Sequence, residues 1–426
     1  MANKSYKILL FYCLVFYLAG FMFKDLTPTG AKGDFYAFTW VIIQDFKKDF
    51  FNSIINFGQY GDASYPFFYI FNSYLNPFSK TIFSYHLSTT ITGLVTFLLF
   101  AMVVKREKNL DKLSSLALAS TILLLPFFIS RNYWGTSSFL AWLTFIISIN
   151  YFLLVFNNSN NRRKFINTIL FCFFSSISIY IKPYFIFFSI FFLIKIFMKE
   201  ELNLKILTLL LYSIFSLPGF YLIYTWGGII ATDAQNSILD PNNHIHPQNF
   251  LRNLIIIPTI FLFYFVPIFI HLIFQKKFNL IFLNHLPVLL ISFILLICLD
   301  IYGFFDYLKY QELGGGAILK LNKLIINDYL YLFLIATAAG LSIIYNLIKF
   351  DPKNNFTIIA LIFVIFGLPK ILYQDYLEPL LIFLIYTNII NNDYLQLDQK
   401  NTKTFTLISV LFYSLYLISS VLYKKL

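Results

Sequence analysis

Two aspartates that each follow a glycine are the residues of this chain best suited to acid–base chemistry. Asp34 stands in Gly-Asp-Phe-Tyr and Asp62 in Gly-Asp-Ala-Ser-Tyr-Pro, near the two ends of a polar, aromatic-rich loop from Lys24 to Lys80. A carboxylate that aromatic side chains partly desolvate at a membrane surface is a stronger general base than one in water. Ordinary turn residues are the alternative, because glycine and aspartate are both common in turns. We predict that Asp34 and Asp62 are catalytic.

Two basic residues at the ends of apolar runs could bind phosphate. Arg131 opens Arg-Asn-Tyr-Trp-Gly directly after one run, and Lys182 stands before a proline between two others. A guanidinium can hold two phosphate oxygens at once, whereas lysine acts as a point charge. Anchoring at the membrane interface is the alternative for Arg131, and snorkelling to the headgroups is the alternative for Lys182, slightly favoured there. Both residues are candidates for binding a donor phosphate.

A polar stretch between two later apolar runs, residues 226–253, is rich in side chains that bind sugar hydroxyls. It contains a His-x-His pair, but no third ligand is evident, so a metal site is weakly indicated and we expect none. Hydrogen bonding to a sugar or to a glycan acceptor fits these residue types better. The candidates are Asp240, Asn243, His244, His246 and Gln248.

One more carboxylate, Glu378, lies at the start of an apolar run in Leu-Glu-Pro. An ionisable group in such a position is costly unless it meets a cation or hydroxyl groups. We therefore predict that Glu378 contributes to sugar or acceptor binding near the outer surface.

Composition excludes a soluble globular protein, since 59% of the residues are hydrophobic and only 12% are charged. The net charge of +12 does not indicate nucleic-acid binding, because the basic residues cluster in short loops between apolar runs. The three cysteines all lie inside apolar runs, so neither a disulfide framework nor a zinc site is expected. We expect membrane lipids as partners, and no cofactor.

The apolar runs are about 20 residues long, the length that a helix needs to cross a bilayer. Their number predicts an all-α, polytopic protein with about thirteen transmembrane helices, in a single integral membrane domain covering residues 1–426. The first run lacks a small-residue cleavage site, so we expect a retained helix rather than a signal peptide. The predicted spans are Tyr6–Phe23, Thr81–Val104, Leu113–Ser130, Thr136–Phe156, Phe165–Ile181, Pro183–Phe197, Lys205–Thr225, Leu254–Phe274, Leu280–Tyr302, Tyr329–Ile348, Phe356–Leu368, Leu377–Ile390 and Phe405–Tyr423.

The basic loops set the expected orientation. With a cytoplasmic N-terminus, every loop on the inner side carries Lys or Arg, as the positive-inside rule requires. Almost all of the candidate residues then face the extracytoplasmic side of an inner (plasma) membrane. In the loop of residues 24–80, apolar residues recur at three- and four-residue spacing from Phe35 to Ile55, which indicates amphipathic helices lying on the membrane face.

With these residues assembled, the chain resembles the GT-C superfamily of integral membrane glycosyltransferases, and most closely the dolichyl-phosphate-glucose α-1,2-glucosyltransferase family. The first loop of that family carries an early acidic motif and then an Asp shortly before Pro-x-x-Tyr. Asp34, followed by Asp62 with Pro66 and Tyr69, is similar. The early acidic pair of the family is a single aspartate here.

The later motifs of the family also have counterparts, in the same order. Its Gly-Gly-Ile-Val and Asp-x-x-Asn-His patterns look like residues 227–230 and 240–244, with His246 and Gln248 standing for a later His and Gln. Its Leu-x-Glu-Pro-Arg-Tyr pattern looks like Leu-Glu-Pro at residues 377–379, although Leu380 replaces the Arg.

The resemblance implies an inverting hexosyltransferase that moves a sugar from a polyprenyl-phosphate donor to a lipid-linked glycan acceptor in glycan or cell-surface polysaccharide biosynthesis. Asp34 would deprotonate the acceptor, and Asp62 would orient the acceptor or share that role. Arg131 and Lys182 would hold the donor phosphate. The scheme requires no metal, because a lipid monophosphate is already a competent leaving group.

Two alternatives remain open at this point. A Wzy-type O-antigen or capsule polymerase also has many spans and outer loops, but such proteins typically place paired arginines in large periplasmic loops, and the outer loops here after the first are poor in Arg. A lipid-linked glycan flippase or transporter would carry ionisable residues at the membrane midplane, whereas this chain keeps nearly all its charges at span ends.

Overall fold

The computed structural model describes residues 2–23, 30–60, 64–226, 247–276, 278–309, 314–326, 329–369, 372–391, 397 and 399–425. In a bilayer each backbone N–H and C=O must be satisfied inside the protein, which favours helices. Every regular element in these ranges is indeed a helix, mostly α-helices with a few short 3-10 or π-helices. The predicted all-α class is therefore confirmed.

The chain divides into two compact units, each made of several segments. Unit 1 comprises Met1–Phe11, Val104–Ile122 and Asn242–Leu415, and unit 2 comprises Tyr12–Val103, Leu123–Pro241 and Tyr416–Leu426. The single domain expected for residues 1–426 stays a prediction. Helices α1 (Ala2–Met22), α6 (Ile82–Glu107) and α21 (Gln399–Lys425) contribute residues to both units.

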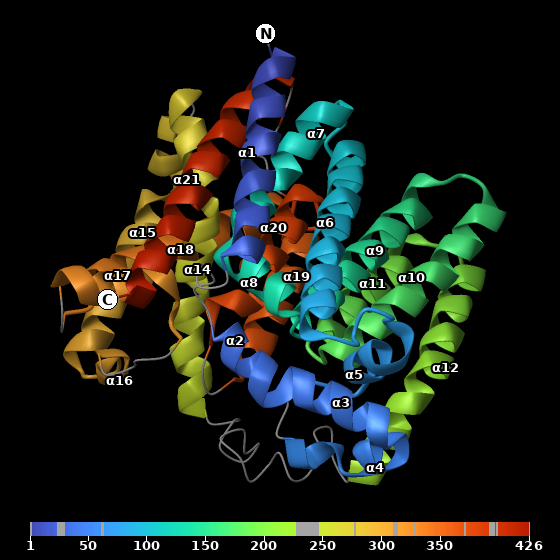
Figure 1. The fold of residues 1–426 in the computed structure, drawn as a ribbon. Helices are drawn as coiled ribbons and strands as arrows, with labels where there is room; N and C mark the ends of the chain where they lie inside the picture. Colours follow the sequence, from blue (N-terminus) through green and yellow to red (C-terminus); the bar gives the residue numbers. More distant parts are fainter. Residues whose placement is uncertain are drawn as a thin grey trace. The chain divides into compact units, whose positions relative to one another are not determined.

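Unit 2 is built around α10, which packs against three other helices. These are lined up side by side in Figure 1, in green. Aromatic rings fill the contacts between these helices: the ring centroids of Phe152 and Phe192 are 4.4 Å apart. Phe152 also meets Phe171 of α10 at 5.6 Å. The four helices are α9 (Ser138–Asn157), α10 (Asn161–Ile181), α11 (Phe185–Lys199) and α12 (Leu202–Trp226).

The loop between α1 and α6 folds into a series of short helices in unit 2. Three of them, α2, η2 and α3, follow one another without a break over residues 31–48, and none of the described helices of this loop is among those long and apolar enough to cross a membrane. Ile42, Ile43 and Phe46 of α3 are buried, while Val41 is 43% exposed. The position of this segment on a membrane face stays a prediction. The elements are α2 (Ala31–Asp34), η2 (Phe35–Thr39), α3 (Trp40–Lys48), α4 (Phe50–Ile55), η3 (Phe57–Tyr60), α5 (Phe67–Ile70) and η4 (Phe71–Leu75).

Hydrogen bonds from η4 hold α3 in place. Ser73 Oγ donates to the carbonyl of Ile43 at 2.9 Å, and the Tyr74 hydroxyl donates to the carbonyl of Phe46. Asp49 then ends α3 with an extended backbone and caps α4 by accepting from the N–H of Asn52. The loop is therefore a folded part of unit 2.

Unit 1 is built around α14. A Cβ on Gly340 of α18 would lie 2.0 Å from the carbonyl oxygen of Pro258 in α14, so only glycine permits this helix contact. Helix α15 packs on the same α18. The elements of unit 1 are α7 (Lys112–Ala119), α14 (Pro247–Phe274), α15 (Phe278–Ile301), α16 (Asp306–Lys309), α17 (Gly316–Ile326), α18 (Tyr331–Phe350), α19 (Pro352–Gly367), η7 (Gln374–Tyr376) and α20 (Glu378–Tyr386).

Eight helices in the described ranges are long and apolar enough to cross a membrane, or nine if one sharply bent pair counts as a span. The predicted count of about thirteen spans is thus not confirmed. The predicted span Leu113–Ser130 is that bent pair, broken at Leu125 before a proline. Helices α11, α19 and α20, with 15, 16 and 9 residues, are too short, and α15 has only 16 residues in its described apolar part.

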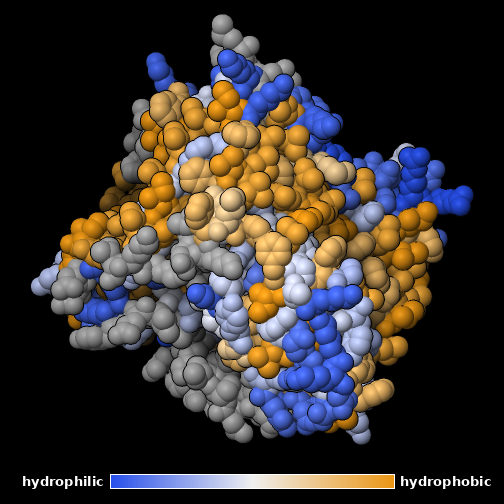
Figure 2. Space-filling view, viewed as in Figure 1, coloured by the Kyte–Doolittle hydropathy of each residue, from blue (hydrophilic) through white to orange (hydrophobic). Residues whose placement is uncertain are grey.

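The surface fits a membrane protein. Figure 2 shows broad hydrophobic areas, with hydrophilic residues gathered in separate patches. On α12, Leu217, Phe220 and Tyr221 are each more than 60% exposed, although such residues avoid water. Together with the eight long apolar helices, this indicates an integral multi-pass membrane protein.

Candidate functional site

Asp34 and Arg131 meet in unit 2, although 97 residues separate them along the chain. Nη1 of Arg131 donates to Oδ2 of Asp34 at 2.5 Å. The Asp34 side chain is 47% exposed and the Arg131 side chain 16%. The contact joins a residue predicted to be the base with a residue predicted to bind phosphate.

Helix α8 (Pro126–Trp134) positions Arg131. Leu125 has an extended backbone, as a residue before proline prefers, and Pro126 starts the helix. Gly135 ends the helix in the left-handed conformation, with φ of +64°, and its carbonyl accepts from the Tyr85 hydroxyl. Both ends of α8 are thereby fixed, so the guanidinium extends from a defined last turn.

Asp34 is positioned by its neighbour Phe35, which is fully buried in an aromatic cluster. The Phe35 ring lies 4.6 Å from that of His86 and 5.8 Å from those of Tyr85 and Trp134. The aromatic side chains therefore enclose Phe35 and leave Asp34 half exposed. Asp34 is only partly buried, and its close neighbour is the cation of Arg131.

Lys182 ends α10 and reaches the other end of the first loop. Its Nζ donates to Oγ of Ser64 at 2.9 Å, and Ser64 Oγ lies 3.1 Å from Oγ of Ser137. Ser64 and Ser137 are both buried. Lys182 thus points into the protein rather than along the surface, which disfavours snorkelling to the headgroups. Ser64 follows Asp62 by two residues, but Asp62 itself lies outside the described residues.

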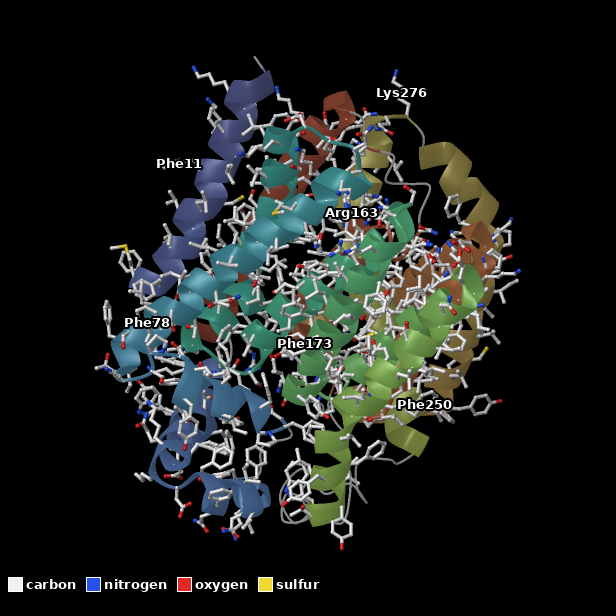
Figure 3. All side chains as sticks on the ribbon, turned by 90° about the vertical axis from the view of Figure 1, so that its right-hand side faces the viewer. Phe11, Phe78, Arg163, Phe173, Phe250 and Lys276 are labelled. Atoms are coloured by element: carbon white, nitrogen blue, oxygen red, sulfur yellow. The ribbon has the colours of Figure 1, made fainter. Side chains whose placement is uncertain are left out.

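An apolar cavity of about 380 Å³ lies between the first loop, α10 and α12 in unit 2. Its lining is almost entirely hydrophobic and includes Pro66, Phe173 and Phe215; Phe173 is labelled on α10 in Figure 3. Pro66 follows Ser64 by two residues, and Tyr180, which also lines the cavity, precedes Lys182 by two. The chain therefore carries an apolar cavity and a cation–hydroxyl contact on the same two segments.

Tyr180, which lines this cavity, links α10 to α12 by hydrogen bonds. Its hydroxyl donates to the carbonyl of Phe215 at 2.6 Å and accepts from the N–H of Gly219 at 2.8 Å. The intervening Pro218 lies inside α12 and has no N–H, so the ladder of helix hydrogen bonds is weakened here. Spacing in the sequence gave no sign of this bridge.

The end of α12 is held by stacking. The Trp226 ring stacks on Tyr65 at 5.6 Å and on Phe57 at 5.8 Å, with interplanar angles of 11° and 17°. Burial, and to a smaller extent Tyr180, raises the pKa of Tyr65, so its phenol stays neutral. The first loop thus holds Trp226, the first residue of the predicted sugar-binding stretch.

Most of that predicted stretch lies outside the described residues. Asp240, Asn243, His244 and His246 are not described, and neither is the Gly-Gly element before them. Gln248 lies in the first turn of α14, but its side chain is not described. Their predicted role in sugar or acceptor binding stays a prediction.

Glu378 is described, in unit 1, and it is fully buried. Its Oε2 accepts from the Tyr264 hydroxyl at 2.9 Å, and that hydroxyl accepts from Nε2 of Gln374 at 3.0 Å. Oε1 of Gln374 in turn accepts from the N–H of Ala317, the second residue of α17, at 2.7 Å. The expected hydroxyl partner of Glu378 is therefore a tyrosine of the protein.

Among the described residues, no three His, Cys, Asp or Glu side chains gather as a metal site would require.

The structure also points to a residue that the sequence analysis did not single out, Arg252 near the start of α14. A basic residue among apolar ones, two positions before the apolar run begins, was the available signal.

The chain matches no protein-family model, and neither curated proteins nor solved structures give a match. Its likeness to the GT-C glycosyltransferases thus depends on the motifs of the sequence, and membership of that superfamily is a proposal.

Proposed function

We propose that the protein is an inverting membrane glycosyltransferase that transfers a hexose from a polyprenyl-phosphate sugar to a lipid-linked glycan. The ion pair between Asp34 and Arg131 is the observation that supports this most. A transfer from a phosphate donor needs a base for the acceptor and a cation for the leaving phosphate, close together. On this proposal the site faces the extracytoplasmic side of an inner (plasma) membrane.

In the proposed reaction, Asp34 takes the proton of the acceptor hydroxyl while the hydroxyl oxygen attacks the anomeric carbon. The bond between that carbon and the phosphate oxygen breaks, and its electron pair stays on the polyprenyl phosphate. Attack from the face opposite the phosphate inverts the configuration. Arg131, which holds one oxygen of Asp34 through Nη1, would bind the donor phosphate and so keep donor and base close together.

The contacts of Lys182 support a lipid-phosphate donor. A second cation, bonded to Ser64 at 2.9 Å, would add to the charge that meets a phosphate. The cavity of about 380 Å³ is apolar and within the size range of ligand pockets, so it could take part of an isoprenoid chain. Asp62, Asp240, Asn243, His244, His246, Gln248 and Glu378 keep the roles that the resemblance implies.

The test is transfer of a radiolabelled sugar between lipids by the purified protein, followed by mass spectrometry of the lipid-linked products. Asp34→Asn should lower the rate about 100-fold or more, as expected for loss of a general base. Asp45→Asn is the matched control, because Asp45 lies in the same loop and contacts Lys48 and Tyr60. Transfer at the wild-type rate by Asp34→Asn would refute the assigned mechanism, and growth of the product by whole repeat units would identify a polymerase.

One observation favours a second candidate, movement of a lipid-linked glycan across the membrane. All nine residues of α20 are buried, including Glu378. Ionisable residues buried in membrane proteins commonly serve transport. A transporter would move the glycan between the leaflets of a vesicle without changing its mass, and Glu378→Gln would stop the movement while Asp34→Asn would not.

A further inference from the structure

Arg252 has a guanidinium edge that the described protein does not satisfy. Its Nε and Nη2 atoms are buried, and among the described residues neither meets a hydrogen-bond acceptor. These two nitrogens form the side edge of the guanidinium, the fork that holds two oxygens of one oxyanion. The edge is therefore shaped for a ligand with paired oxygens.

Burying two guanidinium donors without acceptors costs free energy, and the described neighbours of Arg252 compensate for only part of it. The Arg252 guanidinium lies over the Tyr307 ring, with its carbon 5.9 Å from the ring centroid. A cation–π contact is weaker than two hydrogen bonds to a charged group. The carboxylate next to Tyr307 in sequence, Asp306, accepts from Nζ of Lys309 at 2.7 Å, so it is already engaged with another cation.

The position of Arg252 along α14 bears on which kind of oxyanion would reach it. Arg252 follows Phe250 by two residues, and Figure 3 labels Phe250 near one end of this helix and Lys276 just beyond its other end. The helix from Phe250 to Phe274 is among the most apolar of the candidate spans, so Arg252 lies where such a span begins. In a bilayer this is the level of the phosphate groups.

We propose that Arg252, backed by the Tyr307 ring, is a binding site for a phosphate group, with Nε and Nη2 each donating to one phosphate oxygen. The phosphate belongs either to a lipid headgroup or to a free phosphate ion. The site lies in unit 1 and uses neither Asp34 nor Arg131. Phosphate binding there can therefore be tested independently of the proposed transferase activity. Both donors are buried, so the side chains that cover the Arg252 guanidinium must move before a ligand can reach it.

The experiment measures binding of three probes to the purified full chain in detergent by isothermal titration calorimetry. The probes are dihexanoyl phosphatidic acid, inorganic phosphate and dihexanoylglycerol, which lacks the phosphate. Arg252→Lys keeps the charge and loses the fork, so phosphate binding should weaken about tenfold, and Arg252→Gln should weaken it about 100-fold. Arg163→Gln, an exposed arginine on α10, is the matched control and should bind as wild type does.

The outcomes separate the sources. Tighter binding of phosphatidic acid than of inorganic phosphate, both reduced in Arg252→Lys, identifies a lipid headgroup; equal binding identifies free phosphate. Tyr307→Leu keeps the fork, so it should stay within about fivefold of wild type. The proposal is overturned if Arg252→Lys binds as tightly as wild type, if dihexanoylglycerol binds as well as phosphatidic acid, or if the wild-type chain binds neither phosphate probe.

Discussion

Replacing Gly135 with alanine should destabilise unit 2 and displace the base-to-cation contact. With φ of +64°, an alanine at position 135 would be strained by about 1–2 kcal/mol. The new Cβ would also lie 2.4 Å from a ring carbon of Tyr85 and 2.8 Å from a methyl of Thr89. Both neighbours are buried, so the crowding adds about 1–3 kcal/mol, and the total is about 3 kcal/mol.

The assay is thermal unfolding of the purified protein, followed by tryptophan fluorescence, because Trp134 is the residue before Gly135. A loss of about 3 kcal/mol lowers the unfolding temperature of a unit of this size by about 6–12 °C. Gly33→Ala is the control, since a Cβ on Gly33 would meet nothing within 4 Å. Transfer activity should fall with Gly135→Ala, because Gly135 N–H bonds to the carbonyl of Arg131. Equal unfolding temperatures for the two variants would show that this reasoning about the turn is wrong.

Two further predictions concern a partly buried hydroxyl, that of Tyr180, and a partly buried ammonium, that of Lys108. Tyr180→Phe removes the hydroxyl that bridges Phe215 and Gly219, which should cost about 1–2 kcal/mol; its unfolding temperature should fall relative to that of Tyr224→Phe, and equal values would contradict the bridge. Burial lowers the pKa of Lys108, beside α6, to about 8, an effect that Glu107 partly opposes. Between pH 8 and 10.5 the unfolded chain binds this proton and the folded chain does not, so stability should rise with pH by about 3 kcal/mol. An unfolding temperature that rises no more steeply over this range than in Lys108→Met would refute this assignment.

Hydrophobic pattern alone located most of the long helices. The runs predicted to form α9, α10, α12 and α14 are long and predominantly apolar, so the need to satisfy the backbone in lipid determines their structure. The same pattern failed at Leu113–Ser130, where a proline interrupts the hydrogen-bond ladder. It also counted short buried helices such as α20 as spans, because a buried core helix and a membrane span have the same composition.

The residue types of the candidate site were recognisable from the sequence, but their contacts were not. Arg131 and Asp34 are 97 residues apart, and Lys182 and Ser64 are 118 apart, so only tertiary packing brings them together. The aromatic residues near Asp34 were also visible in the sequence. The sequence did not show whether they would enclose Asp34 or its neighbour, because that depends on which side of the short helix faces inward; in the structure that side carries Phe35.

The most direct test of the central claim is the rate at which purified Asp34→Asn and Arg131→Lys proteins transfer a sugar from polyprenyl phosphate to a lipid-linked acceptor. We expect the wild type and Asp45→Asn to add one hexose and Asp34→Asn to lose about 100-fold or more in rate. Arg131→Lys should also lose rate, because a lysine cannot bind base and phosphate as a fork. Wild-type rates in both Asp34→Asn and Arg131→Lys, or no transfer by the wild type with any polyprenyl-phosphate hexose, would contradict it.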